Sequence, residues 1–318
     1  MPENVSVVPA ISVLVPVLDE QDTVGDLASQ VAAVLDGLGR SFELVFIDDG
    51  STDETVKRIR DVRHGEARVK LVQLRRNFGK AAALCAGFDH CRGELVVTID
   101  GDLQDDPSEI PRLLEALEQG ELDLVSGWKR DRMDPASKRY PSRLFNWVTR
   151  KIARVDLHDF NCGFKLYRKA VLEQVSIYGE LHRYIPVLAS RRGFRVGEVR
   201  VRHHPRRHGT TKYGWDRLYK GLLDLMTVLF ITKYTRRPLH LFGVFGLLFG
   251  GIGLGINAYL VMLKFLEGES LSRRPLLLLG VLLMVLGFQI LTTGLLAEMI
   301  TFKNFRRSDS YSVREVLE

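Results

Sequence analysis

Two patterns of hydrophobic positions alternate along the first part of the chain: short continuous apolar runs, and longer stretches in which apolar residues recur every three or four positions. A short apolar run bounded by turn residues is typical of a buried strand, whereas the longer periodic pattern is typical of an amphipathic helix. The apolar runs predict strands at residues 11–17, 42–47, 69–74, 95–99 and 122–126. The periodic stretches predict helices at residues 23–38, 53–62, 81–90 and 108–119. This alternation predicts an α/β fold with a mostly parallel sheet, helices on both faces, and ligands at the carboxyl ends of the strands.

Two later stretches contain no charged residue, Leu239–Leu263 and Pro275–Ala297. A helix needs about 20 apolar residues to cross a bilayer, so both stretches are predicted to be transmembrane helices. A buried helical hairpin in a soluble protein is the alternative, but uncharged runs of this length are rare there. The pattern therefore adds a C-terminal two-helix transmembrane hairpin to the α/β fold.

Basic residues around this hairpin predict its orientation. Lysines and arginines flank it at Lys233, Arg236, Arg237, Lys303, Arg306 and Arg307. Positive charge is concentrated on the cytoplasmic side of membrane proteins, and the basic residues of the connecting loop weaken this bias without reversing it. The first ten residues do not resemble a secretory signal. We therefore expect an integral protein of the plasma or inner membrane, with the large N-terminal part and both termini in the cytoplasm.

Composition and net charge indicate which classes of partner the protein binds. The chain has 318 residues, a formal net charge of +6 and a pI of about 9.2. Such a charge suits nucleic acid, an anionic membrane surface or a phosphorylated substrate. No recognised nucleic-acid motif accompanies the charge, so we expect the membrane and phosphorylated ligands as partners, and no nucleic acid. Cys85, Cys91 and Cys162 form no Cys-x-x-Cys pair, which predicts free thiols in a reducing compartment.

An acidic run follows the fourth predicted strand. Asp100 and Asp102 are two positions apart, so in extended chain their side chains point the same way. Two carboxylates that converge at a strand end form a hard-oxygen site for Mg²⁺ or Mn²⁺, the ions that usually accompany a diphosphate. A solvated loop is one alternative, and a cap for the helix that Pro107–Glu109 begins is another.

Polar residues also follow the first three predicted strands. Asp48 and Asp49 end the second strand, where a carboxylate can accept a hydrogen bond from a nucleobase N–H or a ribose hydroxyl. Ser51 and Glu54 also match a capping box. The basic loop 75–80 opens the next helix and suits either a diphosphate or a solvated turn. A dinucleotide enzyme and a P-loop NTPase are disfavoured, because neither Gly-x-Gly-x-x-Gly after the first strand nor a Walker lysine loop is present.

A second basic region extends from residue 202 to residue 214 and includes His203 and His204. Adjacent residues of a strand point apart, and no acidic partner lies near these histidines in the sequence, so zinc is not favoured. We expect instead a basic loop that closes over phosphates. The next stretch, Trp215–Tyr234, has the pattern of an amphipathic helix on a membrane surface.

Taken in order, four motifs resemble the family 2 glycosyltransferases of the GT-A fold. The motifs are Val15–Glu20, Ile47–Asp53, Asn77–Lys80 and Asp100–Gln104. The likeness is closest to the polyprenyl-phosphate glycosyltransferases, such as dolichol-phosphate mannose synthase and its bacterial relatives. It covers residues from about 10 to 235, and the two C-terminal spans are similar to those of the membrane-anchored bacterial branch.

The resemblance implies roles for individual residues. Those implied to contact the nucleotide-sugar are Pro16, Glu20, Asp48, Asp49, Lys80 and Asp100. Asp100, Asp102 and Gln104 are implied to form a metal–diphosphate centre with Mg²⁺ or Mn²⁺. Residues 159–168 are similar to the family's acceptor-side motif, with Asp159 as the implied base. At Leu18 and Asp19 the family often has an aromatic residue and then Asn, which leaves UDP and GDP both open.

A polyprenyl phosphate acceptor needs positive charge more than it needs a base. A phosphate monoester is largely ionised near neutral pH, its second pKa being about 6. Cationic side chains must then bring this anion close to a site that already holds a diphosphate. We expect Arg130, Arg139 and Arg143, which follow the fifth strand, to bind the acceptor phosphate.

These expectations define a domain plan and a function. The plan is a cytosolic GT-A domain at 1–214, an amphipathic interfacial helix at 215–235, two transmembrane helices within 236–302 (about 239–263 and 275–299), and a cytosolic tail at 303–318. The expected activity is metal-dependent, inverting transfer of one sugar from a UDP- or GDP-sugar to undecaprenyl or dolichyl phosphate at the cytosolic face, with Asp102 and Asp159 catalytic.

Two alternatives stay open. A processive polysaccharide synthase usually has more spans, and in the resembling families a Gln-x-x-Arg-Trp motif that is absent from this sequence. A membrane scaffold that binds nucleotide-sugar without turnover is the non-catalytic alternative, which the presence of Asp100, Asp102 and Asp159 disfavours. The pattern leaves a homo-oligomer open.

Overall fold

The computed structural model describes residues 8–130, 149–150, 155–175, 179–204, 238–267 and 275–303. The chain divides into two compact units, Met1–Val228 and Leu229–Glu318, and each is described by itself. Arg139, Arg143, the predicted interfacial helix at 215–235 and the tail from residue 304 onwards lie outside the described residues.

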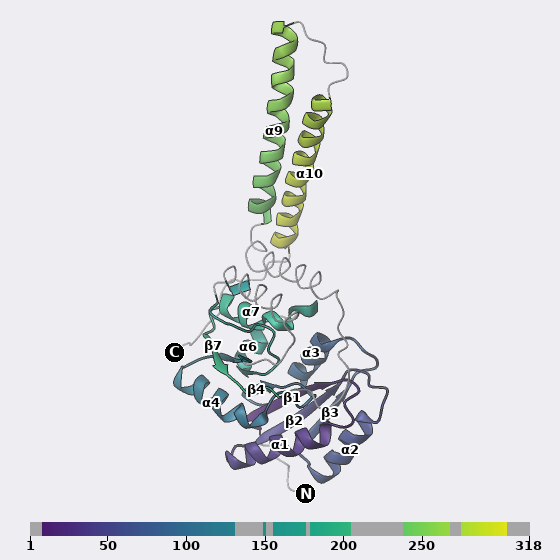
Figure 1. Ribbon diagram of the computed structural model, residues 1–318, viewed down its shortest axis with the longest axis vertical. Coiled ribbons are helices and arrows are strands. Elements are labelled where there is room, and N and C mark those ends of the chain that lie inside the picture. The colour runs from purple at the N-terminus through teal and green to yellow at the C-terminus, as the bar shows by residue number, and fades with distance from the viewer. Residues whose placement is uncertain are drawn as a thin grey trace. The chain divides into compact units, whose positions relative to one another are not determined.

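In the described part of the first unit, one mixed sheet of seven strands forms the centre (Figure 1). The strands are β1 (Ile11–Val17), β2 (Phe42–Asp48), β3 (Val69–Gln73), β4 (Leu95–Thr98), β5 (Leu124–Trp128), β6 (Lys165–Arg168) and β7 (Val196–Arg200). Their order across the sheet is β3-β2-β1-β4-β6-β5-β7. The neighbouring strands pair in parallel except at β6, which is antiparallel to both β4 and β5. The predicted mostly parallel sheet is therefore confirmed.

The sequence pattern did not predict β6 or β7. Each is short and mixes polar with apolar residues, with Lys165 and Arg168 at the ends of β6 and Gly197 and Glu198 inside β7. Strand β5 begins at Leu124, two residues later than predicted. Because β6 enters the sheet between β4 and β5, it brings the segment that precedes Lys165 to the carboxyl end of β4.

Helices cover both faces of the sheet, as predicted (Figure 1). The helices and 3-10 turns of this unit are α1 (Val24–Gly37), α2 (Thr55–Gly65), α3 (Lys80–His90), η1 (Pro107–Glu109), α4 (Ile110–Gln119), α6 (Lys169–Gln174), η2 (Gly179–Tyr184) and α7 (Ile185–Arg191). The four predicted helices are confirmed, with ends that differ by up to three residues. Buried residues of α1, α2 and α4 share one hydrophobic cluster, and those of α3, α6 and α7 lie mainly in a second cluster.

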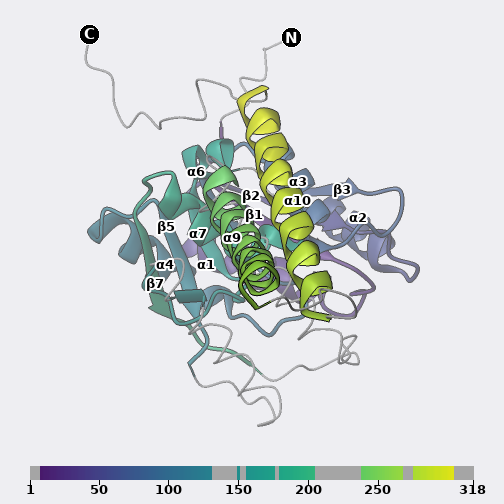
Figure 2. The same ribbon diagram turned by 90° about the horizontal axis from the view of Figure 1, so that it is seen from above.

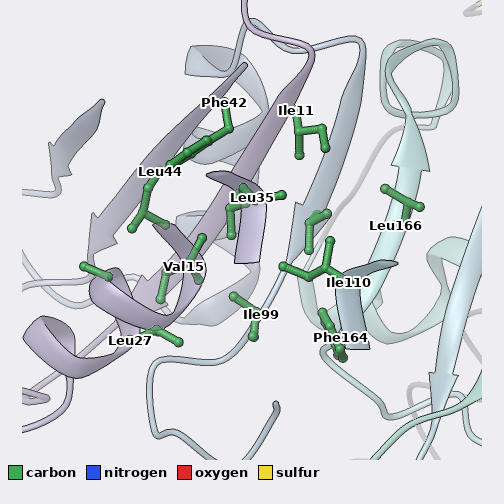
Figure 3. Packing of buried hydrophobic residues seen from close by; sticks show 14 of the residues in the cluster. Ile11, Val15, Leu27, Leu35, Phe42, Leu44, Ile99, Ile110, Phe164 and Leu166 are labelled. Atoms are coloured by element: carbon green, nitrogen blue, oxygen red, sulfur yellow. The ribbon is translucent and has the colours of Figure 1, made fainter. Parts of the chain in front are cut away.

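The first cluster fills the space between the sheet and α1 and α4 (Figure 3). Ile11 and Val15 of β1 lie near Leu27 and Leu35 of α1, and all four are fully buried. Leu14, which lies between Ile11 and Val15 on β1, belongs to the second cluster, on the other face of the sheet. Burial of one such side chain stabilises the fold by about 1.5–3 kcal/mol. A sheet packed on both faces is a rigid support for the loops at its carboxyl edge.

The second unit contains two long helices, α9 (Pro238–Glu267) and α10 (Pro275–Lys303), which run side by side (Figure 2). Both are long and apolar enough to cross a membrane. Only 17% and 11% of their most hydrophobic windows are buried, which argues against the alternative of a buried hairpin. The two predicted spans are therefore confirmed as apolar helices, each a few residues longer than expected.

Glycines set the contact between these helices. A methyl group at Gly246 would lie 2.8 Å from the carbonyl oxygen of Gly287 on α10, so the backbones approach closely, as glycine allows in membrane helices. Among the described residues, no atom lies within 4 Å of such a methyl group at Gly251 or Gly255, so these two glycines are not at the contact. The Glu298 carboxylate accepts a hydrogen bond from Leu239 N–H at 3.2 Å, which ties the end of α10 to the beginning of α9.

Candidate active site

The loops after β1 and β2 are joined by hydrogen bonds between side chains and backbone. Asp19 Oδ1 accepts from Thr52 N–H at 2.8 Å, and Ser51 Oγ accepts from Asp19 N–H at 2.9 Å. Asp19 has a positive φ of 54°, a conformation that Asp tolerates better than most residues. Ser51 therefore joins two loops, and the predicted capping box with Glu54 was wrong, since the helix there has no side-chain cap.

Asp48 lies at the carboxyl end of β2 with a fully buried side chain. One carboxylate oxygen, Oδ1, accepts a hydrogen bond from Ser51 N–H at 3.1 Å. The other, Oδ2, is buried and has no hydrogen-bond partner within the described part of the chain. Because a buried acceptor without a partner is costly, Oδ2 is suited to accept a hydrogen bond from a ligand.

Pro16 and Glu20 lie at the same carboxyl edge of the sheet as Asp48. Pro16 is opposite Ile47 in the parallel register of β1 and β2. Glu20 begins the turn into α1, where its N–H donates to Thr55 Oγ1 at 2.8 Å. The structure thus gathers these predicted nucleotide residues at neighbouring strand ends.

Asp49 holds the loop that follows β3. Its two carboxylate oxygens accept from Phe78 N–H at 2.8 Å and Gly79 N–H at 2.9 Å. The loop lies so close to Gly50 that a methyl group there would be 2.5 Å from the carbonyl carbon of Arg76. Asp49 therefore positions the N-terminus of α3, and its predicted contact with a nucleotide stays a prediction.

Lys80, the first residue of α3, reaches the carboxylate of Asp100 just beyond β4. The Lys80 Nζ to Asp100 Oδ1 distance is 2.5 Å. Burial would raise the pKa of Asp100, but Lys80, Lys129 and Lys165 outweigh it and hold the pKa well below its usual value. Asp100 is therefore ionised near neutral pH, inside a group of three lysines.

Lys129 is one of two lysines here that the sequence analysis missed. It follows β5 directly, and its Nζ lies 2.6 Å from Oδ1 of Asp105 in an almost fully buried ion pair. Burial favours its neutral form, but Asp105 outweighs this effect and raises the pKa of Lys129. Arg130, the residue that the sequence analysis selected, is exposed. The sequence pattern ended this strand at residue 126, three positions before Lys129, so it did not reveal that Lys129 directly follows β5.

Lys165, the first residue of β6, is the other missed lysine. Its side chain is only 3% exposed, and its Nζ donates to the carbonyl oxygen of Cys162. Burial lowers the pKa of Lys165, although Asp159 and Asp100 partly oppose that shift. It escaped prediction because β6 itself was not predicted.

The segment before Lys165 brings Asp159 to this group. Asp159 is buried, and its Oδ1 accepts from Asn161 N–H at 3.1 Å. Further along, Gly163 packs against the carboxylate of Asp100, since a methyl group there would lie 2.6 Å from Oδ1. The carboxyl ends of β4 and β5 and the start of β6 thus converge on Asp100.

Asp102 and Gln104 continue the loop after β4. Asp102 Oδ1 accepts from Gln104 N–H at 3.2 Å, and both residues are partly exposed. Within the described ranges, no group of three His, Cys, Asp or Glu residues is arranged to hold a metal ion. Two carboxylates and one amide are hard oxygen donors of the kind that Mg²⁺ shares with a substrate's phosphates. These residues fit an ion that binds together with a diphosphate.

The neighbouring acidic residues pair with the two histidines. His203 Nδ1 lies 3.6 Å from Asp105 Oδ1, and His204 Nε2 lies 3.3 Å from Asp106 Oδ2. These acidic partners lie about 100 residues away in the sequence, so the local pattern around the histidines did not reveal them. Asp106 also accepts from Ser108 N–H at 2.9 Å, so Asp106, and not Asp100 or Asp102, caps the following helix.

The chain is similar to known proteins over most of its length. The model of the family described as Glycosyl transferase family 2 matches residues 12–176. The dodecaprenyl-phosphate galacturonate synthase of Rhizobium johnstonii is 42% identical over 315 residues, which is 97% of this chain and 93% of the relative. The undecaprenyl-phosphate 4-deoxy-4-formamido-L-arabinose transferase of Pseudomonas aeruginosa is 37% identical over 91% of this chain and 84% of its own length.

A solved structure shares the fold. Glucosyl-3-phosphoglycerate synthase from Mycobacterium tuberculosis, crystallised with Mn²⁺, uridine diphosphate and phosphoglyceric acid, superposes with a TM-score of 0.54. It is 22% identical, and the match covers 70% of this chain and 78% of that one.

Proposed function

The chain belongs to glycosyl transferase family 2, and from this premise we propose that it transfers one sugar from a nucleotide-sugar to a polyprenyl phosphate at the membrane. The names of both relatives above contain a polyprenyl phosphate, and the similarity to the first covers 97% of this chain, which includes the two apolar helices as well as the sheet. The observation that carries the proposal is the position of Asp100 among Lys80, Lys129 and Lys165. Such a site balances the charge of two phosphate-bearing substrates.

On the donor side, Oδ2 of Asp48 is buried and has no partner among the described residues, which supports a hydrogen bond to a nucleobase or ribose. Pro16 and Glu20 border the same region, and Asp49 holds the loop that presents Lys80 to the diphosphate. This arrangement suits a UDP- or a GDP-linked sugar.

Asp100, Asp102 and Gln104 would hold Mg²⁺ or Mn²⁺ together with the phosphates of the donor. When bound, such an ion stabilises the charge that develops on the departing diphosphate. Lys80 adds a second positive charge on the same side, since its Nζ already lies at Asp100.

On the acceptor side, the nucleophile is an ionised phosphate oxygen of the lipid. It attacks the anomeric carbon while the bond from that carbon to the diphosphate oxygen breaks, so the configuration inverts and a nucleoside diphosphate leaves. Lys129 and Lys165 offset the repulsion between the two anions. Asp159 orients the acceptor, which arrives already deprotonated.

The test is an assay of purified protein in detergent with undecaprenyl phosphate, Mg²⁺ or Mn²⁺, and labelled UDP- and GDP-sugars. The panel includes UDP-linked galacturonic acid and UDP-linked 4-deoxy-4-formamido-L-arabinose. We expect one donor to give a labelled, chloroform-soluble lipid, and we expect chelation of the metal to stop its formation. If no donor in the panel labels lipid, the proposal fails.

Substitutions of single acidic residues at the site sharpen this assay. Asp102→Asn should reduce kcat by at least about 10³-fold, because it removes a ligand of the diphosphate centre. Asp159→Asn should cost less, since the acceptor needs orientation and not deprotonation. Asp106→Asn is the matched control, because Asn can replace Asp as a helix cap. Equal and complete loss in the first two variants would contradict the role given to Asp159.

A further inference from the structure

Four side chains form a cluster at the edge strand β7, which we call the β7 clamp: Trp128, His158, Glu198 and Arg200. Glu198 is its centre, and its side chain is only 8% exposed. Its Oε1 accepts from the backbone N–H groups of His158 and Asp159, each at 2.9 Å. Its Oε2 lies 2.8 Å from His158 Nδ1. One carboxylate thus holds two consecutive residues of the loop that carries Asp159.

The other members fix the His158 ring. The ring stacks on Trp128 with 4.3 Å between centroids and 15° between planes. Arg200, which is opposite Trp128 in the pairing of β5 with β7, lies over the same indole ring at 4.9 Å. The Nη1 atom of Arg150 is 3.4 Å from His158 Nε2. Because arginine only donates, Nε2 is the acceptor and Nδ1 carries the hydrogen that points to Glu198.

This arrangement is more than is needed to fill the edge of a sheet. Burial raises the pKa of Glu198, whereas the hydrogen bonds from His158 and Asp159 lower it. Burial of this carboxylate at a strand edge therefore costs free energy of folding. Its hydrogen bonds hold the backbone of Asp159, in a segment that has no regular secondary structure.

We propose that Glu198 is a positioning residue that fixes the main chain at His158 and Asp159 and so aims the Asp159 carboxylate at the acceptor phosphate. The inference rests on the proposed function, because it assumes that Asp159 orients the acceptor. Glu198 contacts no substrate and acts only through the loop.

The sheet order predicts which kinetic parameter depends on Glu198. The donor residues Asp48 and Pro16 lie on β2 and β1, while Glu198 lies on the edge strand β7, which β4, β6 and β5 separate from β1. Loss of Glu198 should therefore leave donor binding intact and reduce the rate of transfer. A displacement of about 1 Å in a catalytic group can cost about 10²-fold in rate.

Three substitutions distinguish the effect of the Glu198 hydrogen-bond geometry from the effect of its negative charge. Glu198→Ala removes both backbone contacts, and we expect kcat to fall by about 10- to 100-fold with an unchanged KM for the donor. Glu198→Gln keeps an oxygen for both N–H groups and should recover at least about ten-fold of that loss. Glu198→Asp keeps the charge but is one methylene too short, so it should resemble Glu198→Ala.

The matched control is Glu121→Ala. Glu121 also pairs with a basic residue near this edge, Arg195, at 2.6 Å, but its side chain is 72% exposed, and exposed pairs contribute little. Activity is normalised to the folded fraction, which is measured by thermal unfolding in detergent. If Glu198→Ala does not fold, the comparison of Glu198→Gln with Glu198→Asp tests the proposal.

An active Glu198→Ala, a better rescue by Asp than by Gln, or a loss confined to the donor KM would overturn the inference. An inactive wild-type protein would overturn the proposed function instead.

Discussion

Lys80 and Asp100 face each other at the centre of the site, and each side chain is about one-third exposed. Burial favours the neutral form of Lys80, but Asp100 more than offsets this effect and raises the pKa of the lysine. In return, Lys80 is the strongest of the charges that lower the pKa of Asp100. Each residue thus keeps the other ionised.

Replacement of Lys80 by Met should weaken donor binding and change the pH profile. A hydrogen bond to a charged group contributes about 1.5–3 kcal/mol. Because Lys80 is partly exposed, we expect the lower end of this free-energy range, which corresponds to a rise in donor KM of about ten-fold. Because the pKa of Asp100 rises when Lys80 is lost, the acid limb of kcat/KM should move to higher pH. Steady-state kinetics across pH measures both effects.

Lys57→Met is the control for this substitution, since Lys57 forms an exposed pair with Glu54 at 3.1 Å on the surface of α2. An unchanged donor KM and an unmoved acid limb in Lys80→Met would contradict the role of Lys80.

Sequence reasoning at this scale identified the residues that belong to motifs and missed those defined by burial. Lys80, Asp100 and Asp48 stand at strand ends or helix starts that hydrophobic periodicity locates, so their convergence was predictable. Lys129 is a single charged residue directly after the short strand β5, and Glu198 is a single charged residue inside the unpredicted strand β7. Nothing in a local pattern distinguishes a buried ionic side chain from a solvated one.

At the scale of elements, the reversed strand β6 shapes the site. It pairs Thr98 with Lys165, next to the end of β4, and Thr98 Oγ1 donates to the carbonyl oxygen of Gly163 at 2.7 Å. The segment that enters β6 therefore runs directly over Asp100. An antiparallel strand inside a parallel sheet follows from contacts distant in sequence, and for this reason the alternating pattern did not predict it.

Gly163→Ala tests this close approach. The new methyl group would lie within 3 Å of three carboxylate atoms of Asp100, so either the carboxylate or the loop must move. We expect activity to fall by about 10²-fold while the sheet stays folded, as activity assays and thermal unfolding of the same preparation would show.

The matched variant is Gly65→Ala at the end of α2, where no atom of the described part of the chain lies within 4 Å of the added methyl group. It should keep full activity, because alanine is favoured over glycine in a helix. Full activity in Gly163→Ala would contradict the proposed packing.

At the scale of the whole molecule, the chain divides into two compact units, Met1–Val228 and Leu229–Glu318, while the domain plan expected from the sequence stays a prediction. In the hairpin, the hydrogen bond between Leu239 and Glu298 places the beginning of α9 beside the end of α10. A membrane-spanning hairpin of this form returns the chain to the side from which it came. The expected interfacial helix and the arginines Arg139 and Arg143 lie outside the described residues, and their roles stay predictions.

The expected topology places both termini in the cytoplasm. A green fluorescent protein fused after Glu318 should fluoresce, and alkaline phosphatase fused there should be inactive, because the first matures in the cytoplasm and the second outside it. Fusions within the loop between α9 and α10 should give the reverse pattern. An active phosphatase at the C-terminus would contradict the topology and, with it, access of the tail to the cytoplasm.

The central claim is that one sugar passes to the phosphate oxygen of a polyprenyl phosphate, with cleavage between the sugar and the diphosphate. Analysis of both products of a single reaction by mass spectrometry tests it most directly. We expect equal amounts of a free nucleoside diphosphate and a polyprenyl monophosphate that bears one sugar. Release of a nucleoside monophosphate with a polyprenyl diphosphate sugar would contradict it, since a different bond would then have been broken.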